Sequence, residues 1–276
     1  MDCRILPTQI IALLSSLLLA VACGSPAPTA APTSTPVPPT ATPTPAPPTP
    51  TPVLVPTPAA RGSWNYMVLG DSSSWGFPTL YARYIEADLG VMVRVVSWAA
   101  GGFTSAQVLK QLRDNAQERL DVSQAQVVTF YDNPLHLIGM RITGSEFGNH
   151  ECSAQVVAAY KAELGAIADE IMALRKGQPT IIRTYTRFMP FYRAWKAQGQ
   201  VEEYRRCVAA LDEAIFEIGR ERGILVADTA LAMNGPNRDQ DPNDKGYLYD
   251  GVHENDEGAK IVAGVFRKLG YAAIVP

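Results

Sequence analysis

Three polar residues, in two segments that are far apart in this chain, have the types and the spacing that nucleophilic catalysis needs. Ser72 lies in the segment GDSSSWG, and Asp250 and His253 are three residues apart in the segment YLYDGVH. A serine hydroxyl becomes an effective nucleophile only when a base takes its proton and a third group orients that base. We therefore interpret Ser72 as a nucleophile, His253 as its base and Asp250 as the orienting acid.

Each of these residues also has an ordinary structural explanation. Ser72 could cap the helix that follows it, and Asp250 and His253 could both be solvated in a loop before a helix. His253 could also act on Ser72 without help from Asp250. Asp71, beside the serine, is better explained as a hydrogen-bond acceptor that braces the loop than as a reacting group. The residues alone leave these alternatives open.

Other groups of possible ligands lack the spacing of a metal site. His136 and His150 have no cysteines or carboxylates at the spacing of a zinc site, so we expect surface or packing roles for both. Residues 237–244, NRDQDPND, are rich in oxygen ligands but lack a complete calcium loop with its distal glutamate. We expect a polar loop there, and neither a metal nor a cofactor in the protein.

Five short apolar runs are candidates for the strands that position these residues. They occupy 66–70, 91–98, 125–131, 179–185 and 224–228, and helical patterns are present at 78–90, 105–120, 153–177, 201–223 and 256–270. Nearly all-apolar strands that alternate with helices are typical of a parallel sheet covered on both faces. With right-handed connections, the sequence predicts a three-layer α/β/α sandwich around a five-stranded parallel sheet.

Ligands of such sheets bind outside the carboxyl ends of the strands. The loops to search are therefore those after strands one, two, three and five, which contain GDSSSWG, AAGGFTS, YDNPLH and the long segment ending in YDGVH. Two further segments, 138–152 and 183–195, could either pack under an insertion or form an apolar wall for a substrate.

Four blocks of the sequence resemble the SGNH (GDSL-type) esterase and lipase superfamily. VLGDSSSWG is similar to the first block, GGFTSAQVL to the second and DGVHENDEGAKIVA to the last, while DNP falls where the third belongs. The resemblance spans about Tyr66 to Leu269. It implies a flavodoxin-like fold and a serine esterase in which Ser72, Asp250 and His253 are the catalytic residues.

The same resemblance implies a set of donors for the oxyanion of an acyl-transfer reaction. The backbone N–H of Ser72 is one donor, and that of Gly102 is the second, with Gly101 as the alternative in the adjacent register. The third donor of the family is an asparagine in a G-x-N-D block, for which Asn133 is the only residue that fits. Tyrosine and proline stand here for the glycine and the aspartate of that block, so Asn133 could instead be a turn residue.

The amino-terminal segment has the composition of a targeting signal and a linker. Residues 1–22 contain a short apolar run that is typical of a signal peptide, and AVAC before Gly24 resembles a lipobox in which Cys23 is lipidated. Residues 25–58 hold 14 of the chain's 22 prolines and no charge, which favours an extended polyproline stalk. We expect a lipid-anchored stalk at 23–61 and a hydrolase domain at 62–276 outside the cytoplasm; simple secretion is the alternative.

Two cysteines of the expected domain are predicted to form a disulfide. Cys152 and Cys207 are its only cysteines, they lie at or within helices on either side of the fourth strand, and an exported domain permits oxidation.

The net charge and its distribution limit the possible partners. The chain has a formal net charge of −3 and no basic run, which argues against nucleic acid as a partner. We expect a monomer that touches the membrane only through its lipid anchor and acts on a small-molecule or glycan ester. The predicted function is hydrolysis of short-chain acyl or carbohydrate O-acetyl esters, and the alternative is a non-catalytic binding module on the same scaffold.

Overall fold

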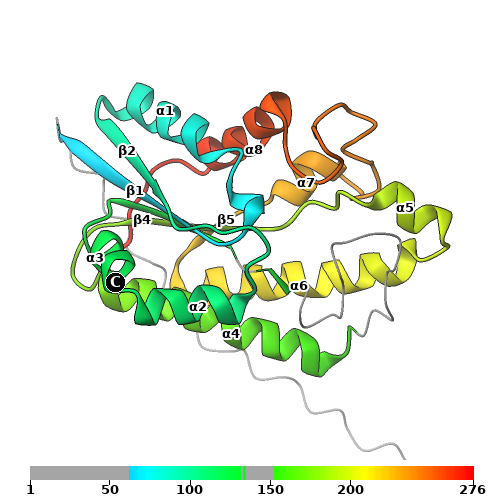
Figure 1. Cartoon of the computed structure of the whole chain (residues 1–276), viewed down its shortest axis with the longest axis horizontal. Coiled ribbons are helices and arrows are strands. Elements are labelled where there is room, and N and C mark those ends of the chain that lie inside the picture. The colour runs from blue at the N-terminus through cyan, green and yellow to red at the C-terminus, as the bar shows by residue number, and fades with distance from the viewer. Residues whose placement is uncertain (1–61, 132, 135–151) are drawn as a thin grey trace, which may run out of the picture. The chain divides into compact units, whose positions relative to one another are not determined.

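The central element of the protein is a five-stranded, fully parallel sheet (Figure 1). The computed structural model describes residues 62–131, 133–134 and 152–276. The strands are β1 Ser63–Leu69, β2 Met92–Ser97, β3 Val127–Phe130, β4 Ile181–Tyr185 and β5 Leu225–Ala227, in the spatial order β2-β1-β3-β4-β5. This order is that of flavodoxin-like doubly wound sheets, so the predicted fold class is confirmed.

Helices cover both faces of the sheet. Figure 1 shows α1 and α8 above the sheet and α2, α4 and α6 below it. The long helices are α1 Pro78–Leu89, α2 Ser105–Asp114, α3 Ala116–Ser123, α4 Ala154–Leu174, α6 Val201–Arg222 and α8 Asp256–Lys268. None of the helices in the described part of the chain is both long and apolar enough to cross a membrane.

The two layers of core arise from the alternation of side chains along the strands. In β1, Met67 and Leu69 face the helices α2, α4 and α6, whereas Tyr66 and Val68 pack with α1 and α8. All four side chains are buried, as expected when successive residues of a strand point to opposite faces and both faces are covered.

A crossover in the strand order creates the position of the site. The chain leaves β1 for β2 on one side, and later returns to place β3 on the other side of β1. The loops that follow β1 and β3 therefore diverge from each other at the carboxyl ends of these strands. Ligands of such sheets bind at this position. Leu69 and Phe130, the last residues of these strands, are paired. Ser72 and Asn133 each lie three positions after one of these residues, so the two loops start from neighbouring points.

One predicted helix is two helices in the structure. The pattern at 105–120 is interrupted at Asn115, whose ψ of 107° is extended rather than helical. The side chain of Asn115 accepts hydrogen bonds from the backbone N–H groups of Gln117 and Glu118 and so caps α3. The segment Asn-Ala-Gln-Glu carried this capping signal, because asparagine followed three residues later by glutamate is typical of a helix start.

Two short helices occupy segments that the sequence analysis treated as loops. α5 Tyr192–Ala197 follows β4, and α7 Thr229–Asn234 follows β5. The carboxylate of Asp228 accepts the backbone N–H of Leu231 and thereby caps α7. Their hydrophobic pattern is too short to be distinguished from a loop by periodicity.

A disulfide joins Cys152, just before α4, to Cys207 within α6. The two Cα atoms are 5.3 Å apart, within the usual range for a disulfide. The predicted pairing is therefore present, and it ties together two helices that cover the same face of the sheet.

Candidate active site

Ser72, His253 and Asp250 form one hydrogen-bonded chain. The Nε2 atom of His253 lies 2.9 Å from the Oγ atom of Ser72, and the Nδ1 atom lies 2.6 Å from Oδ2 of Asp250. One ring nitrogen can therefore accept the serine proton while the other donates to the carboxylate. The structure brings together the three residues that the sequence singled out, across 181 positions between Ser72 and His253.

Asp250 is held as a carboxylate by donors from its own loop. Its Oδ1 atom accepts the backbone N–H groups of Val252 at 2.9 Å and of His253 at 2.8 Å. Burial by itself would raise the pKa of Asp250, but the hydrogen bonds from the ring and backbone of His253 and from Val252 lower it to about 2. An ionised Asp250 keeps the proton of a neutral imidazole on Nδ1, so Nε2 faces Ser72 as an acceptor.

Two exposed aromatic side chains stack on the ring of His253. The ring centroids of Trp75 and Tyr249 each lie 5.9 Å from that of His253, with interplanar angles of 16° and 22°. Trp75 is 53% exposed and Tyr249 is 65% exposed. Neither residue was predicted from the sequence, although Trp75 lies three positions after the candidate nucleophile and Tyr249 immediately precedes Asp250.

The loop that carries Ser72 is braced by buried polar contacts. Ser72 begins a 3-10 turn, η1 Ser72–Ser74, and Asp71 caps this turn by accepting the backbone N–H and the hydroxyl of Ser73. Gly70 has a φ of 139°, and a Cβ atom there would lie 2.9 Å from the carbonyl oxygen of Tyr131, so a side chain does not fit. Asp71 is thus the bracing acceptor that we predicted, and Ser72 caps no helix.

The predicted oxyanion donors line the same cavity as Ser72. Gly102 has a φ of 74°, which glycine adopts readily, and no heavy atom of the described residues outside its chain neighbours lies within 4 Å of where its Cβ would be. Gly101, the alternative, also lines the cavity. The side-chain amide of Asn133 is buried and donates to Oδ2 of Asp71 at 2.6 Å, which holds it beside the nucleophile loop. The donor roles themselves stay predictions.

A cavity of about 350 Å³ lies beside Ser72 and His253. Its walls come from the loops after β1, β2 and β3, from Val252 and His253 before α8, from the segment after β4, and from α4, α5 and α6. Most of these wall residues are aromatic or aliphatic: Tyr160, Phe188, Phe191, Trp195, Tyr204, Val208, Leu211 and Ile215. In the segment 183–195, Phe188 and Trp195 are buried and also line the cavity, and contact of this segment with a substrate stays a prediction.

Two charged side chains that were not predicted as site residues, Arg187 and Asp212, also line the cavity. Arg187 follows β4 and lies within the segment 183–195, for which we considered only packing or an apolar wall, although the carboxyl end of every parallel strand lies at the same edge of the sheet. Asp212 lies within α6, and nothing in the helical pattern distinguishes it from a solvated residue.

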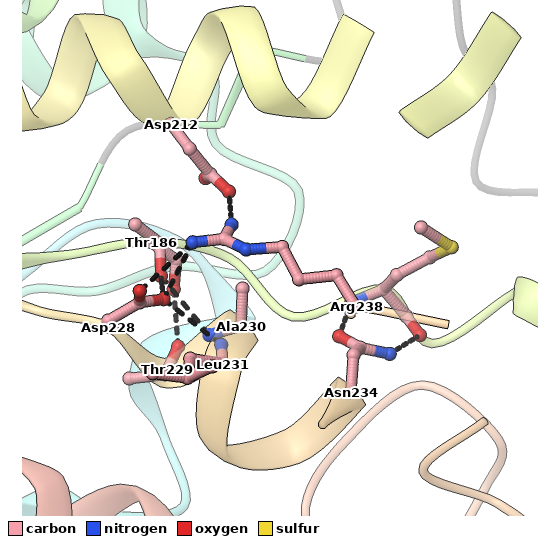
Figure 2. A network of polar contacts seen from close by, with 9 residues as sticks. Thr186, Asp212, Asp228, Thr229, Ala230, Leu231, Asn234 and Arg238 are labelled. Atoms are coloured by element: carbon pink, nitrogen blue, oxygen red, sulfur yellow. Dashed lines mark hydrogen bonds and ion pairs between the residues drawn. The ribbon is translucent and has the colours of Figure 1, made fainter. Parts of the chain in front are cut away.

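The charge of Asp212 is balanced by a network shown in Figure 2. Asp212 forms an ion pair with Arg238, whose guanidinium also donates to both carboxylate oxygens of Asp228 at 2.9 and 3.0 Å. Asp228 in turn accepts the hydroxyl of Thr186 at 2.9 Å. The network therefore connects α6 to the ends of β4 and β5 and leaves Asp212 paired within the cavity wall.

The remaining candidate ligands form no metal site in the described residues. No group of three or more His, Cys, Asp or Glu side chains there could hold a metal ion. In the loop at 237–244, Asp241 is buried and accepts hydrogen bonds from the backbone N–H groups of Arg193 and Asn243. Its carboxylate oxygens therefore hold the loop together and connect it to α5. His136, His150 and Cys23 lie outside the described residues.

Solved structures with the same fold are found, although no protein-family model and no curated protein matches the sequence. A lipase from a goat rumen metagenome is 21% identical, with a TM-score of 0.55, over 76% of this chain and 98% of the other. An acetyl xylan esterase from Geobacillus stearothermophilus is 17% identical, with a TM-score of 0.52, over 76% of this chain and 95% of the other.

These likenesses establish the fold. The chain has the α/β/α architecture that the resemblance to the SGNH hydrolases implied, with the candidate nucleophile, base and acid together at the carboxyl edge of the sheet.

Proposed function

We propose that this protein is an SGNH-type serine esterase that hydrolyses carboxylic esters through an acyl-enzyme on Ser72. The observation that carries the proposal is the hydrogen-bonded chain from Ser72 through His253 to the ionised Asp250, at the edge of an apolar cavity. A lone serine or histidine at such an edge would support only binding, whereas this chain supplies both a nucleophile and a route for its proton.

In the first half of the reaction, the Oγ atom of Ser72 attacks the ester carbonyl while Nε2 of His253 takes the serine proton. The carbonyl π electrons move to the oxygen and form a tetrahedral oxyanion. When this intermediate collapses, the bond to the alcohol oxygen breaks and His253 returns the proton to the leaving alcohol. Ser72 is left acylated, and Asp250 stabilises the imidazolium that forms in between.

In the second half, a water molecule takes the place of the alcohol. The water oxygen attacks the acyl carbon while His253 accepts a proton from the water. When the bond to Ser72 breaks and the acid leaves, His253 donates this proton to the Oγ atom of Ser72. In both halves the oxyanion would be bound by the backbone N–H groups of Ser72 and Gly102 and by the amide of Asn133. Loss of one such donor costs about 3 kcal/mol of transition-state stabilisation in enzymes of this type.

Two features support an ester as the substrate. The cavity beside Ser72 has mostly apolar walls, which suits an acyl group, and the proteins of similar fold include a lipase and an acetyl xylan esterase. Short-chain acyl esters and carbohydrate O-acetyl esters are the classes that we propose to test first. The protein would act outside the cytoplasm as a monomer, anchored through a lipid on Cys23 or simply secreted.

A panel of p-nitrophenyl esters of increasing acyl length, together with acetylated xylan, tests the proposal. We expect the wild-type domain to hydrolyse at least one of them, and we expect Ser72→Ala to abolish this activity while it leaves the circular dichroism spectrum unchanged. Hydrolysis that persists in Ser72→Ala would refute the mechanism. A well-folded wild type that hydrolyses no ester would favour the binding module instead.

A further inference from the structure

Arg187 is a charged wall residue of the cavity that has no hydrogen-bond or ion-pair partner in the described part of the chain. Its side chain is partly buried, and its Nη1 atom is fully buried without a hydrogen-bond partner in the described residues. No ion pair to Arg187 occurs within the described part of the chain either. Its guanidinium carbon lies 4.7 Å above the ring of Phe188, which provides a cation–π contact but accepts none of its N–H groups.

The two carboxylates that line the cavity, Asp71 and Asp212, accept no hydrogen bond from Arg187. Asp71 attracts the guanidinium across space, but its oxygens already accept hydrogen bonds from Ser73 and Asn133. Asp212, the other carboxylate of the cavity wall, is ion-paired to Arg238. Burial would lower the pKa of Arg187, but the attraction of Asp71, Tyr131, Glu254 and Tyr185 raises it, so the group stays cationic.

A cation kept in a partly apolar cavity without hydrogen bonds is costly unless something else completes its contacts. The five N–H donors of a guanidinium match a carboxylate geometrically, in a two-point interaction. The missing partner of Arg187 is therefore best explained as an anionic group on the molecule that fills the cavity.

The cavity is suited to the acyl part of an ester rather than to a polymeric alcohol. Its walls include Tyr160, Trp195, Leu211 and Ile215, which are all buried, so this part of the cavity presents mainly aromatic and aliphatic surface. A volume of about 350 Å³ accommodates an acyl chain of several carbons.

We propose that Arg187 binds a carboxylate at the far end of the substrate's acyl chain, so that the preferred substrates are half-esters of dicarboxylic acids. This inference rests on the proposed esterase function and narrows its substrate class. Arg187 is then a specificity-determining residue, which touches the substrate away from the bond that breaks.

The test compares esters that differ only in the terminal carboxylate. Mono-p-nitrophenyl adipate and suberate are measured against p-nitrophenyl hexanoate and octanoate, which have the same chain lengths. We expect the wild type to prefer the carboxylate-bearing ester at least tenfold in kcat/KM, in keeping with a hydrogen bond to a charged group. Arg187→Met should bring this preference to about one, because kcat/KM should fall more for the carboxylate-bearing ester than for the neutral ester. Arg187→Lys should retain part of the preference.

Arg94→Met is the matched control, because Arg94 is an exposed arginine on β2 that does not line the cavity. It should leave the preference unchanged. A wild-type preference at or below one would overturn the inference whatever the variants do, including a variant that fails to fold. An equal loss on neutral and carboxylate-bearing esters in Arg187→Met would also overturn it, because it would show a structural role as a counter-charge.

A binding measurement separates failure of this inference from failure of the proposed function. Calorimetric titration of monomethyl adipate into Ser72→Ala should show binding that Ser72→Ala/Arg187→Met lacks. Such binding would support the subsite even if the wild type hydrolysed no ester. Hydrolysis of neutral esters without any such binding would overturn the subsite and leave the esterase proposal intact.

Discussion

At the scale of single residues, His253 is the side chain on which the site depends. It contacts Ser72 through Nε2, Asp250 through Nδ1, and the rings of Trp75 and Tyr249 by stacking. Several of these contacts would remain if one partner were lost, so the position of the ring does not depend on Asp250 alone. The role as a base that we propose for His253, by contrast, has no substitute among these contacts.

The residues of the proposed triad should act as one unit. We expect Ser72→Ala and His253→Ala each to lower kcat by at least about 1,000-fold, because each removes the coupled transfer of the serine proton. The double variant should be little worse than either single variant, whereas independent residues would give multiplied losses. Steady-state kinetics on the best p-nitrophenyl ester measures this, and a double variant with multiplied losses would contradict the triad.

At the scale of secondary-structure elements, α6 forms a wall of the cavity with one face. Tyr204, Val208, Leu211, Asp212 and Ile215 all line the cavity, and their spacing places them along one side of the helix. Cys207 lies within this stretch and connects it to the start of α4. The disulfide therefore fixes the helix that lines the cavity to its neighbour.

Removal of the disulfide should destabilise the domain without removing its fold. The bridge closes a loop with a sequence separation of 55, for which restriction of the unfolded chain contributes about 2–4 kcal/mol. We expect Cys152→Ala/Cys207→Ala to lower the free energy of unfolding in urea by that amount. A reducing agent should lower wild-type stability similarly and leave the double variant unchanged; equal sensitivity of both proteins would be inconsistent with the bridge.

The first turn of α3 buries a carboxyl group that should make stability depend on pH. Glu118 is 1% exposed, and its Oε2 atom has no hydrogen-bond partner in the described residues. Burial raises the pKa of Glu118 from 4.5 to about 7, which its hydrogen bond with Gln111 only partly offsets. Between these two values the folded state binds more protons than the unfolded state, so stability falls as the pH rises from 4.5 to 7.

Glu118→Gln should remove this dependence. The variant should gain stability relative to the wild type between pH 4.5 and pH 8, by at most about 3 kcal/mol, since one pKa unit corresponds to 1.36 kcal/mol. Urea unfolding at both pH values measures the difference. Glu203→Gln, at an exposed position of α6, is the control and should show no such change. The same stability difference at both pH values in Glu118→Gln would contradict the burial effect.

At the scale of the whole molecule, the site combines parts of the chain that the sheet brings to one edge. The serine follows β1, the glycines follow β2, Asn133 follows β3, and the acid and base precede α8. The crossover between β2 and β3 separates the first of these loops from the third and makes room between them.

The anchor predicted at Cys23 concerns the location of the whole protein. We expect wild-type protein expressed from its full sequence to fractionate with membranes, because the apolar run and the small residues before Cys23 are typical of a lipoprotein signal. Cys23→Ser should release it into the soluble fraction, while Cys3→Ser, within the signal segment, should not. Retention of Cys23→Ser in the membrane fraction would count against lipidation.

Much of the architecture follows from local patterns in the sequence. Apolar runs of β-branched residues and helical spacing give the five strands and the long helices, because both depend on side chains within one element. The residues GDS and DGVH indicated Ser72, Asp250 and His253 from their types and spacing. The break at Asn115 is also a local feature, because asparagine followed three residues later by glutamate is a helix-capping signal.

The cavity and the balance of charges around it were decided only by the tertiary structure. Whether an aromatic residue of α6 packs against a neighbour or lines a cavity depends on which side chains other elements place opposite it, and no local pattern contains that information. The pairing of charges also depends on other elements. Asp212 forms an ion pair with Arg238, whereas Arg187 has no hydrogen-bond acceptor in the described residues. The sequence by itself determined which residues are candidates for catalysis, because that depends on residue type and spacing. The fold determined the space and the charge around them, because these depend on side chains from several elements.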